Sequence, residues 1–132
     1  MNAMGYLLIA LGGAIGAVAR YALGTAIMSR AAGSFPWGTF VINASGSFLL
    51  GLVNTLLAEH VITNPNWRPL FTIGFVGAYT TFSTFEYETA RLGSSWQAMG
   101  NLVGSVVAGY ACVWLGIFLA RWLTIAHGAA RT

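Results

Sequence analysis

A segment near residue 80 carries residue types from which a pathway for a small anion could be built. Two glycines precede a run of hydroxyl and phenyl side chains there: Gly74, Gly77, Thr80, Thr81, Phe82, Ser83, Thr84 and Phe85. Hydroxyl O–H groups and the positive edges of phenyl rings both favour an anion. Phe82 and Phe85 are three residues apart, so on a helix their rings share one face. Packing of the two rings inside the protein is the simpler alternative.

Other polar residues lie in apolar surroundings and could extend this pathway. Asn43 has a carboxamide that both donates and accepts hydrogen bonds, with packing between helices as its alternative role. Glu88 lies three residues after Phe85. It could line the end of the pathway, or equally well lie in water at the membrane boundary. A charged arginine such as Arg20 has a high free-energy cost within a membrane span. Its side chain therefore either reaches the interface or has a structural or vestibule role. The spans contain no paired carboxylates and no Ser/His/Asp set, so we expect no enzymatic activity.

The composition indicates that membrane-spanning helices position these residues. Of the 132 residues, 57% are apolar and 7% are charged, whereas soluble domains contain about 25% charged residues. A helix needs roughly 20 mainly apolar residues to cross a bilayer, and four stretches are candidates: residues 4–28, 37–58, 69–90 and 99–124. The expected fold is an all-α integral membrane protein with four transmembrane helices in one domain, residues 1–132.

The third of these helices is predicted to be broken between Gly77 and Thr80. Gly74 and Gly77 lower helix propensity, and the hydroxyls that follow compete for backbone hydrogen bonds. A break leaves backbone carbonyls at membrane depth, which is tolerated where they face protein or a cavity. Such carbonyls can hold a hard cation such as Na⁺. His60 and His127 lack ligand-type neighbours, so no side-chain metal site is expected.

Glycines at four-residue spacing predict close approach between helices. They are Gly12, Gly16 and Gly24 in the first stretch, in a series that Arg20 completes, and Gly100 and Gly104 in the last.

The placement of arginine predicts little preference for either orientation in the membrane. The positive-inside rule orients helices by the asymmetry of Lys and Arg near span ends. With four spans, three arginines fall on each side, which leaves no bias and is compatible with insertion in both orientations. One side carries Arg68, Arg121 and Arg131, and the other carries Arg20, Arg30 and Arg91.

Three motifs in the first three stretches together resemble the Fluc (CrcB-type) fluoride channels. They are GGAIGAVARY at residues 12–21, WGTFVINASGSFLLG at 37–51 and GFVGAYTTFSTF at 74–85. The chain length and the layout of four spans agree with this family. The resemblance implies an antiparallel, dual-topology homodimer with two fluoride pores, an arrangement that the even arginine count supports independently.

The same resemblance implies roles for individual residues. Gly77 and Thr80 would offer backbone carbonyls to a structural Na⁺ at the dimer interface. Arg20 would be the arginine of the first span, without direct anion contact. Asn43 would be the pore amide, and the phenyl ring edges would meet the anion. The implied pore residues are Asn43, Thr81, Phe82, Ser83, Thr84, Phe85 and Glu88.

The leading hypothesis is a passive, fluoride-selective ion channel in the inner (plasma) membrane, which exports fluoride and relieves its toxicity. The expected partners are fluoride, a second copy of the chain and the lipid bilayer, with no nucleic acid. One alternative is a small four-span, proton-coupled exporter, which would need a buried carboxylate in an early span; residues 4–28 have none. The other alternative is a membrane subunit that transports nothing and only packs against partners.

Overall fold

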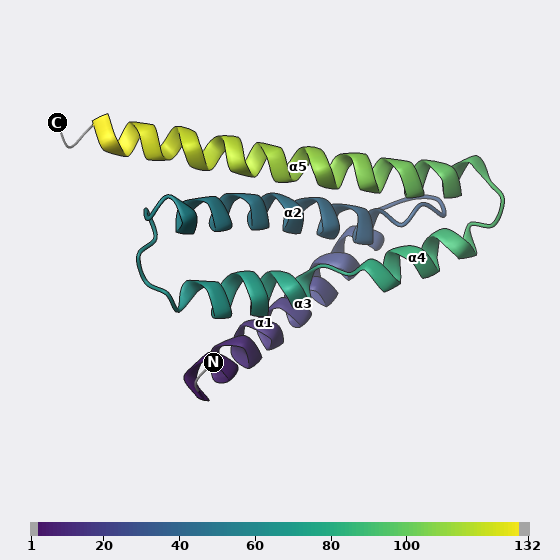
Figure 1. The fold of residues 1–132 in the computed structure, drawn as a ribbon. Coiled ribbons are helices and arrows are strands. Elements are labelled where there is room, and N and C mark those ends of the chain that lie inside the picture. The colour runs from purple at the N-terminus through teal and green to yellow at the C-terminus, as the bar shows by residue number, and fades with distance from the viewer. Residues whose placement is uncertain (1–2, 130–132) are drawn as a thin grey trace.

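The computed structural model describes residues 3–129, with side chains placed as far as residue 126, and this part of the chain folds into helices joined by short connections. Successive long elements run in alternating directions (Figure 1). Arg131 and the side chain of His127 lie outside the described part. The elements are α1 (Ala3–Met28), α2 (Trp37–Ala58), the π-helical segment η1 (Arg68–Val76), α3 (Gly77–Tyr79), α4 (Phe82–Arg91) and α5 (Trp96–Ala129).

Three of these helices are long and apolar enough to cross a membrane. They are α1, α2 and residues Trp96–Ala126 of α5. The prediction of an all-helical membrane protein is therefore confirmed. At 34 residues, α5 is longer than the predicted span at 99–124, and its C-terminal end projects past the neighbouring end of α2 (Figure 1).

The third predicted span is interrupted, and η1, α3 and α4 take the place of one helix. Thr80 (φ −78°, ψ 158°) and Thr81 (φ −151°, ψ 114°) are extended. Gly77 keeps helical angles, φ −61° and ψ −34°. The predicted break is thus present at the end of the expected interval, at Thr80 and Thr81 rather than at Gly77. That this broken segment crosses the membrane stays a prediction.

Glycines allow close approach at two helix interfaces. Cβ atoms at Gly12 and Gly16 of α1 would clash with backbone carbonyls of η1, and those at Gly51 and Gly116 with carbonyls across the α2–α5 interface. Close packing by the first-span glycines is therefore confirmed. In the last span, a Cβ at Gly100 would meet nothing within 4 Å and one at Gly104 would meet only the Phe40 ring at 4.0 Å, so neither glycine allows close approach to another helix of the same chain.

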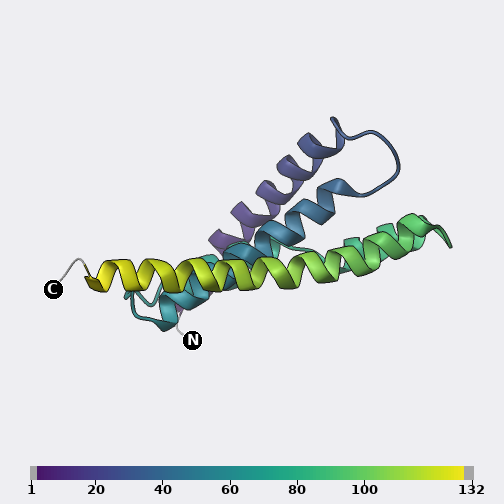
Figure 2. The same ribbon diagram turned by 90° about the horizontal axis from the view of Figure 1, so that it is seen from above.

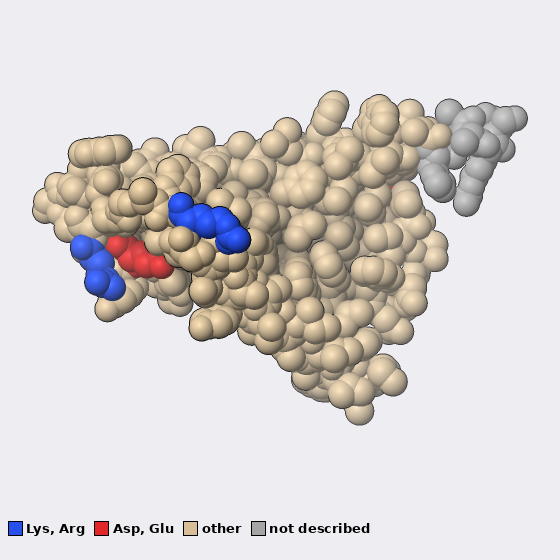
Figure 3. Space-filling model, turned by 180° about the vertical axis from the view of Figure 1, so that it is seen from behind, with Lys and Arg blue, Asp and Glu red and all other residues tan. Residues whose placement is uncertain are grey.

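The surface of this helix bundle is apolar over most of its area. Exposed hydrophobic side chains include Val18 on α1 (68% exposed) and Phe118 on α5 (72% exposed). The linked ends of α1 and α2 diverge from the axis of α5 (Figure 2), although the Ser34 hydroxyl in their connection bonds to Oε1 of Gln97 at the start of α5. On the face drawn in Figure 3, the charged side chains gather toward one end. This distribution is typical of a protein surrounded by lipid or by further copies of itself.

Candidate functional site

Asn43 on α2 takes the place of a helical hydrogen-bond partner at the break. Its Nδ2 donates to the carbonyl of Thr81 at 2.9 Å, and its Oδ1 accepts from the N–H of Thr81 at 2.8 Å. One carboxamide thus satisfies both backbone groups of an extended residue that is only 9% exposed. Buried backbone groups without such partners would be costly, so Asn43 stabilises the break itself.

Thr81 also begins the helix that follows. Its Oγ1 accepts from the N–H of Thr84 at 3.3 Å, as an N-cap does. The Thr81 hydroxyl donates to the Thr84 hydroxyl at 2.8 Å. Because Thr84 accepts in that bond, its own proton is left for another acceptor. The cap therefore presents a hydroxyl donor beside the break.

An open cavity of about 420 Å³, here called the crevice, lies between α2, the break, α4 and α5. The rings of Phe82 and Phe85 both line it, with centroids 5.8 Å apart and planes tilted by 43°. Phe85 is buried (4% exposed), whereas Phe82 is 69% exposed. The predicted shared face is confirmed, but the two rings have different surroundings. The polar residues that line the crevice are Asn43, Ser47, Thr80, Thr81, Ser105 and Tyr110.

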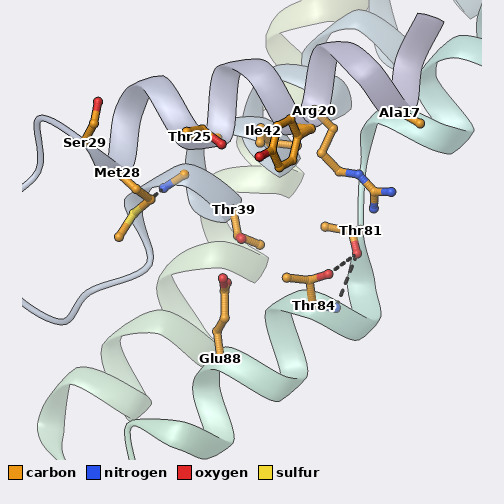
Figure 4. Close-up of a pocket in the computed structure, with 13 residues that line it drawn as sticks. Ala17, Arg20, Thr25, Met28, Ser29, Thr39, Ile42, Thr81, Thr84 and Glu88 are labelled. Carbon is orange, nitrogen blue, oxygen red and sulfur yellow. Dashed lines mark hydrogen bonds between the residues drawn. The ribbon is translucent and has the colours of Figure 1, made fainter. Parts of the chain in front are cut away.

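A second open cavity of about 690 Å³, here called the hollow, lies on the other side of Thr81. Arg20 extends from α1 toward Thr81 and Thr84, and Glu88 extends toward Thr39 (Figure 4). Within the described residues, the Oε2 atom of Glu88 is buried without a hydrogen-bond partner. Thr81 lines both cavities, so the capped break separates the hollow from the crevice.

The break removes the usual helical donors from the backbone carbonyls of residues 77–80, of which Gly77 and Thr80 are the two predicted to bind a cation. In a continuous α-helix the N–H of Thr81 would bond to the carbonyl of Gly77, but here it bonds to Asn43. Likewise the N–H of Thr84 bonds to the Thr81 hydroxyl rather than to the carbonyl of Thr80. Gly77 is exposed, and a Cβ there would meet nothing within 4 Å. This donor set is suited to a hard cation that prefers oxygen ligands.

The structure brings together most of the residues singled out by sequence. Ser83 and Gly77 are the exceptions, because both are exposed and line neither the crevice nor the hollow. Sequence reasoning missed Thr39, which is 9% exposed and lines the hollow. Its position four residues before Asn43 puts it on the same face of α2, and that spacing could have identified it. The residues brought together are Asn43, Thr81, Phe82 and Phe85 at the crevice, and Arg20, Thr81, Thr84 and Glu88 at the hollow.

Comparison with known proteins gives consistent matches along the chain. A protein of Solibacter usitatus named fluoride-specific ion channel FluC is 54% identical over 121 residues, which cover 89% of this chain and 99% of that protein. A protein of Acidobacterium capsulatum with the same name is 51% identical over 122 residues, which cover 89% and 97%. The family described as CrcB-like protein, Camphor Resistance (CrcB), matches residues 7–117. Because that match covers most of the chain, this protein belongs to the CrcB family.

Proposed function

We propose that this protein is a passive, fluoride-specific ion channel. The observation that carries the proposal is the name fluoride-specific ion channel FluC on relatives at 54% and 51% identity over 89% of the chain. The crevice lined by Phe82, Phe85 and Asn43 supports it chemically. Membership of a channel family agrees with the expectation that the chain is not an enzyme.

Neutral donors replace the water of the ion in this proposal. One N–H of Asn43 holds the Thr81 carbonyl, and the second N–H of the same amide is available to an anion. The ring edges of Phe82 and Phe85 add further sites with partial positive charge in the crevice, and the Thr84 hydroxyl adds one at the hollow. Several weak sites allow an ion to lose its hydration shell and still leave. The charged Arg20 faces the hollow rather than the crevice, so its role is to attract anions at the entrance.

The working unit in this proposal is an antiparallel homodimer with two pores. Phe82 is 69% exposed, and Gly77 has open space beside it. The carbonyls of the break that lack helical donors are poorly suited to direct contact with lipid. A second copy in the opposite orientation would cover them and complete each pore. The equal arginine count on the two sides supports mixed orientation.

A structural Na⁺ at the centre of that dimer is part of the same proposal. The carbonyls of Gly77 and Thr80 have lost their helical donors to Asn43 and to the Thr81 hydroxyl. Two such sets, one from each subunit, would surround a cation with oxygen ligands. The ion would hold the breaks of the two subunits together.

The proposed setting is the inner (plasma) membrane, where the channel would let a cell lose fluoride. Hydrogen fluoride crosses membranes as a neutral acid and ionises inside, so the outward gradient needs no coupled energy source. Glu88, with its unpartnered buried oxygen, is the observation that keeps a proton-coupled exporter in consideration. Fluoride movement carries net charge in a passive channel and in a proton antiporter alike, so the two mechanisms differ in whether protons move with the release of fluoride.

Efflux from liposomes distinguishes these possibilities. Purified protein is reconstituted into vesicles loaded with potassium fluoride, and a fluoride electrode records release before and after addition of valinomycin. A passive channel releases fluoride only once potassium can balance the charge. Proton uptake that accompanies fluoride release, recorded with a pH electrode, would favour a proton antiporter, and equal release of chloride would contradict fluoride specificity. No release at all would favour a packing subunit.

A further inference from the structure

Asn101 on α5 is the most completely buried large side chain in the described residues, with 1% exposed. A buried carboxamide in a membrane helix requires hydrogen-bond partners. Its Nδ2 donates to Oγ1 of Thr89 at 2.7 Å, and its Oδ1 accepts from the hydroxyl of Ser105 at 3.2 Å. Asn101 itself lines neither the crevice nor the hollow. Its contacts are with the protein, so its role differs from that of Asn43.

These hydrogen bonds continue to the backbone of a pore phenylalanine. The hydroxyl of Thr89 donates to the carbonyl of Phe85 at 2.7 Å. Its proton is therefore committed, and its oxygen is the acceptor that Asn101 uses. The chain of donors runs in one direction, from Ser105 through Asn101 and Thr89 to Phe85. It connects the α5 wall of the crevice to the helix that carries both rings.

Helix α4 has few other attachments to the rest of the protein. It has ten residues, and Phe85 is the one it buries. Its N-terminus is held where Thr81 bonds to Asn43 of α2. Its second half is held where Thr89 bonds to Asn101 of α5. Two carboxamides from two different helices thus fix α4 on either side of the rings, and Figure 1 shows α4 beside the start of α5.

We propose that Asn101 is a positioning residue, which acts through Thr89 to fix Phe85 at the distance from α5 that the crevice requires. The inference rests on the proposed channel function. A phenyl ring edge attracts an anion only at short range and in a defined orientation, and the ion has little water left to compensate for a misplaced ring. A small outward movement of α4 would therefore slow conduction without preventing folding.

The test compares Asn101→Leu and Thr89→Val with the unaltered protein in liposomes that contain, on average, fewer than one channel per vesicle. Such vesicles give two readouts: the fraction of vesicles that release fluoride, and the release rate of each active vesicle. We expect the fraction to stay unchanged and the rate to fall by about tenfold, the effect of losing one ordinary hydrogen bond. Thr89→Ser keeps the hydroxyl and should restore the rate.

Thr72→Val is the matched control. Thr72 is also buried (7% exposed), and its hydroxyl also bonds to the carbonyl four residues earlier, that of Arg68 at 2.8 Å. Within the described part of the chain, the Thr72 hydroxyl has no hydrogen bond to α5, and Thr72 lines neither the crevice nor the hollow. We expect its release rate to equal that of the unaltered protein.

A spectroscopic measurement separates positioning from loss of folding. With 4-fluorophenylalanine at position 85, the ¹⁹F resonance should shift or broaden in Thr89→Val and remain unchanged in Thr72→Val. Unaltered rates in both Asn101→Leu and Thr89→Val would overturn the inference while leaving the channel function intact. A lower fraction of active vesicles with an unaltered rate would also overturn it, because that result indicates a purely structural role. If the unaltered protein releases no fluoride, the proposed function fails and this inference fails with it.

Discussion

Asn43 and Thr81 are 38 positions apart in the chain, yet one carboxamide pairs with both backbone groups of Thr81, at 2.8 and 2.9 Å. This pairing permits an extended residue between α3 and α4. The second N–H of the Asn43 amide takes no part in this pairing. The break and the anion site of the proposed channel therefore depend on the same side chain.

Asn43→Leu should remove both the support of the break and the amide N–H proposed to bind the anion. We expect fluoride flux to fall by about ten- to hundredfold, since a hydrogen bond to an ion contributes roughly 1.5–3 kcal/mol. Electrode measurements of fluoride release from liposomes would check this. Asn54→Leu is the control, because Asn54 lies on the same helix but is exposed. Equal flux in both variants would mean that the Asn43 amide does not contact the ion.

Phe82→Ala and Phe85→Ala should both reduce flux but differ in stability. Phe85 is 4% exposed, so its truncation leaves a cavity that costs about 3–5 kcal/mol. Phe82 is 69% exposed in the single chain, so Phe82→Ala should lower the melting temperature in detergent much less than Phe85→Ala. Phe118→Ala, at 72% exposure on α5, controls for loss of any exposed ring. Normal flux in both pore variants would show that these rings only pack.

Alanine substitutions at glycine should affect stability differently at the tight α2–α5 interface and at open surface. Gly51→Ala and Gly116→Ala place a methyl group against backbone carbonyls between α2 and α5, and overpacking of this kind costs about 1–3 kcal/mol. Gly100→Ala meets open space and should stabilise α5 by up to about 1 kcal/mol through helix propensity. Thermal unfolding in detergent measures both effects. A melting temperature for Gly51→Ala as high as that for Gly100→Ala would contradict the described α2–α5 contact.

Arg20→Gln should slow fluoride release most strongly at low ionic strength. The guanidinium faces the hollow (Figure 4), where its charge raises the local anion concentration, and salt screens that effect over about 10 Å at 0.1 M. Arg30→Gln is the control, since the exposed Arg30 bonds to the carbonyl of Ala26. Release rates measured across a salt series would show a flattened dependence for Arg20→Gln alone. An unchanged salt dependence would assign Arg20 a purely structural role.

Removal of sodium tests the proposed central cation. With N-methylglucamine as the sole cation in the buffer, the carbonyls of Gly77 and Thr80 would have no sodium ion to bind. We therefore expect the dimer to dissociate more readily. Size-exclusion chromatography across a sodium titration measures this change. Potassium at equal concentration is the control for ionic strength. A dimer that is equally stable without sodium would remove the ion from the proposal.

Much of the site was accessible from the linear order of residues. The apolar composition and the long hydropathic stretches identify a membrane protein because the bilayer requires them wherever a chain crosses it. The run from Thr80 to Phe85 is contiguous, so its hydroxyls and rings had to lie within two turns of one another. Glycine spacing likewise indicated the contact face of α1, because periodicity along one helix is a local property.

Other features depend on which helices meet, and local patterns contain no such information. The break occurs at Thr80 and Thr81 because Asn43 arrives from α2 to replace the helical bonds. Phe82 and Phe85 share a face, yet their exposures differ because α2 and α5 cover only one of them. Gly100 and Gly116 are both glycines in the apolar helix α5, but of the two only Gly116 faces a neighbouring backbone. Burial and long-range pairing are properties of the packed arrangement, so tertiary structure alone decides them.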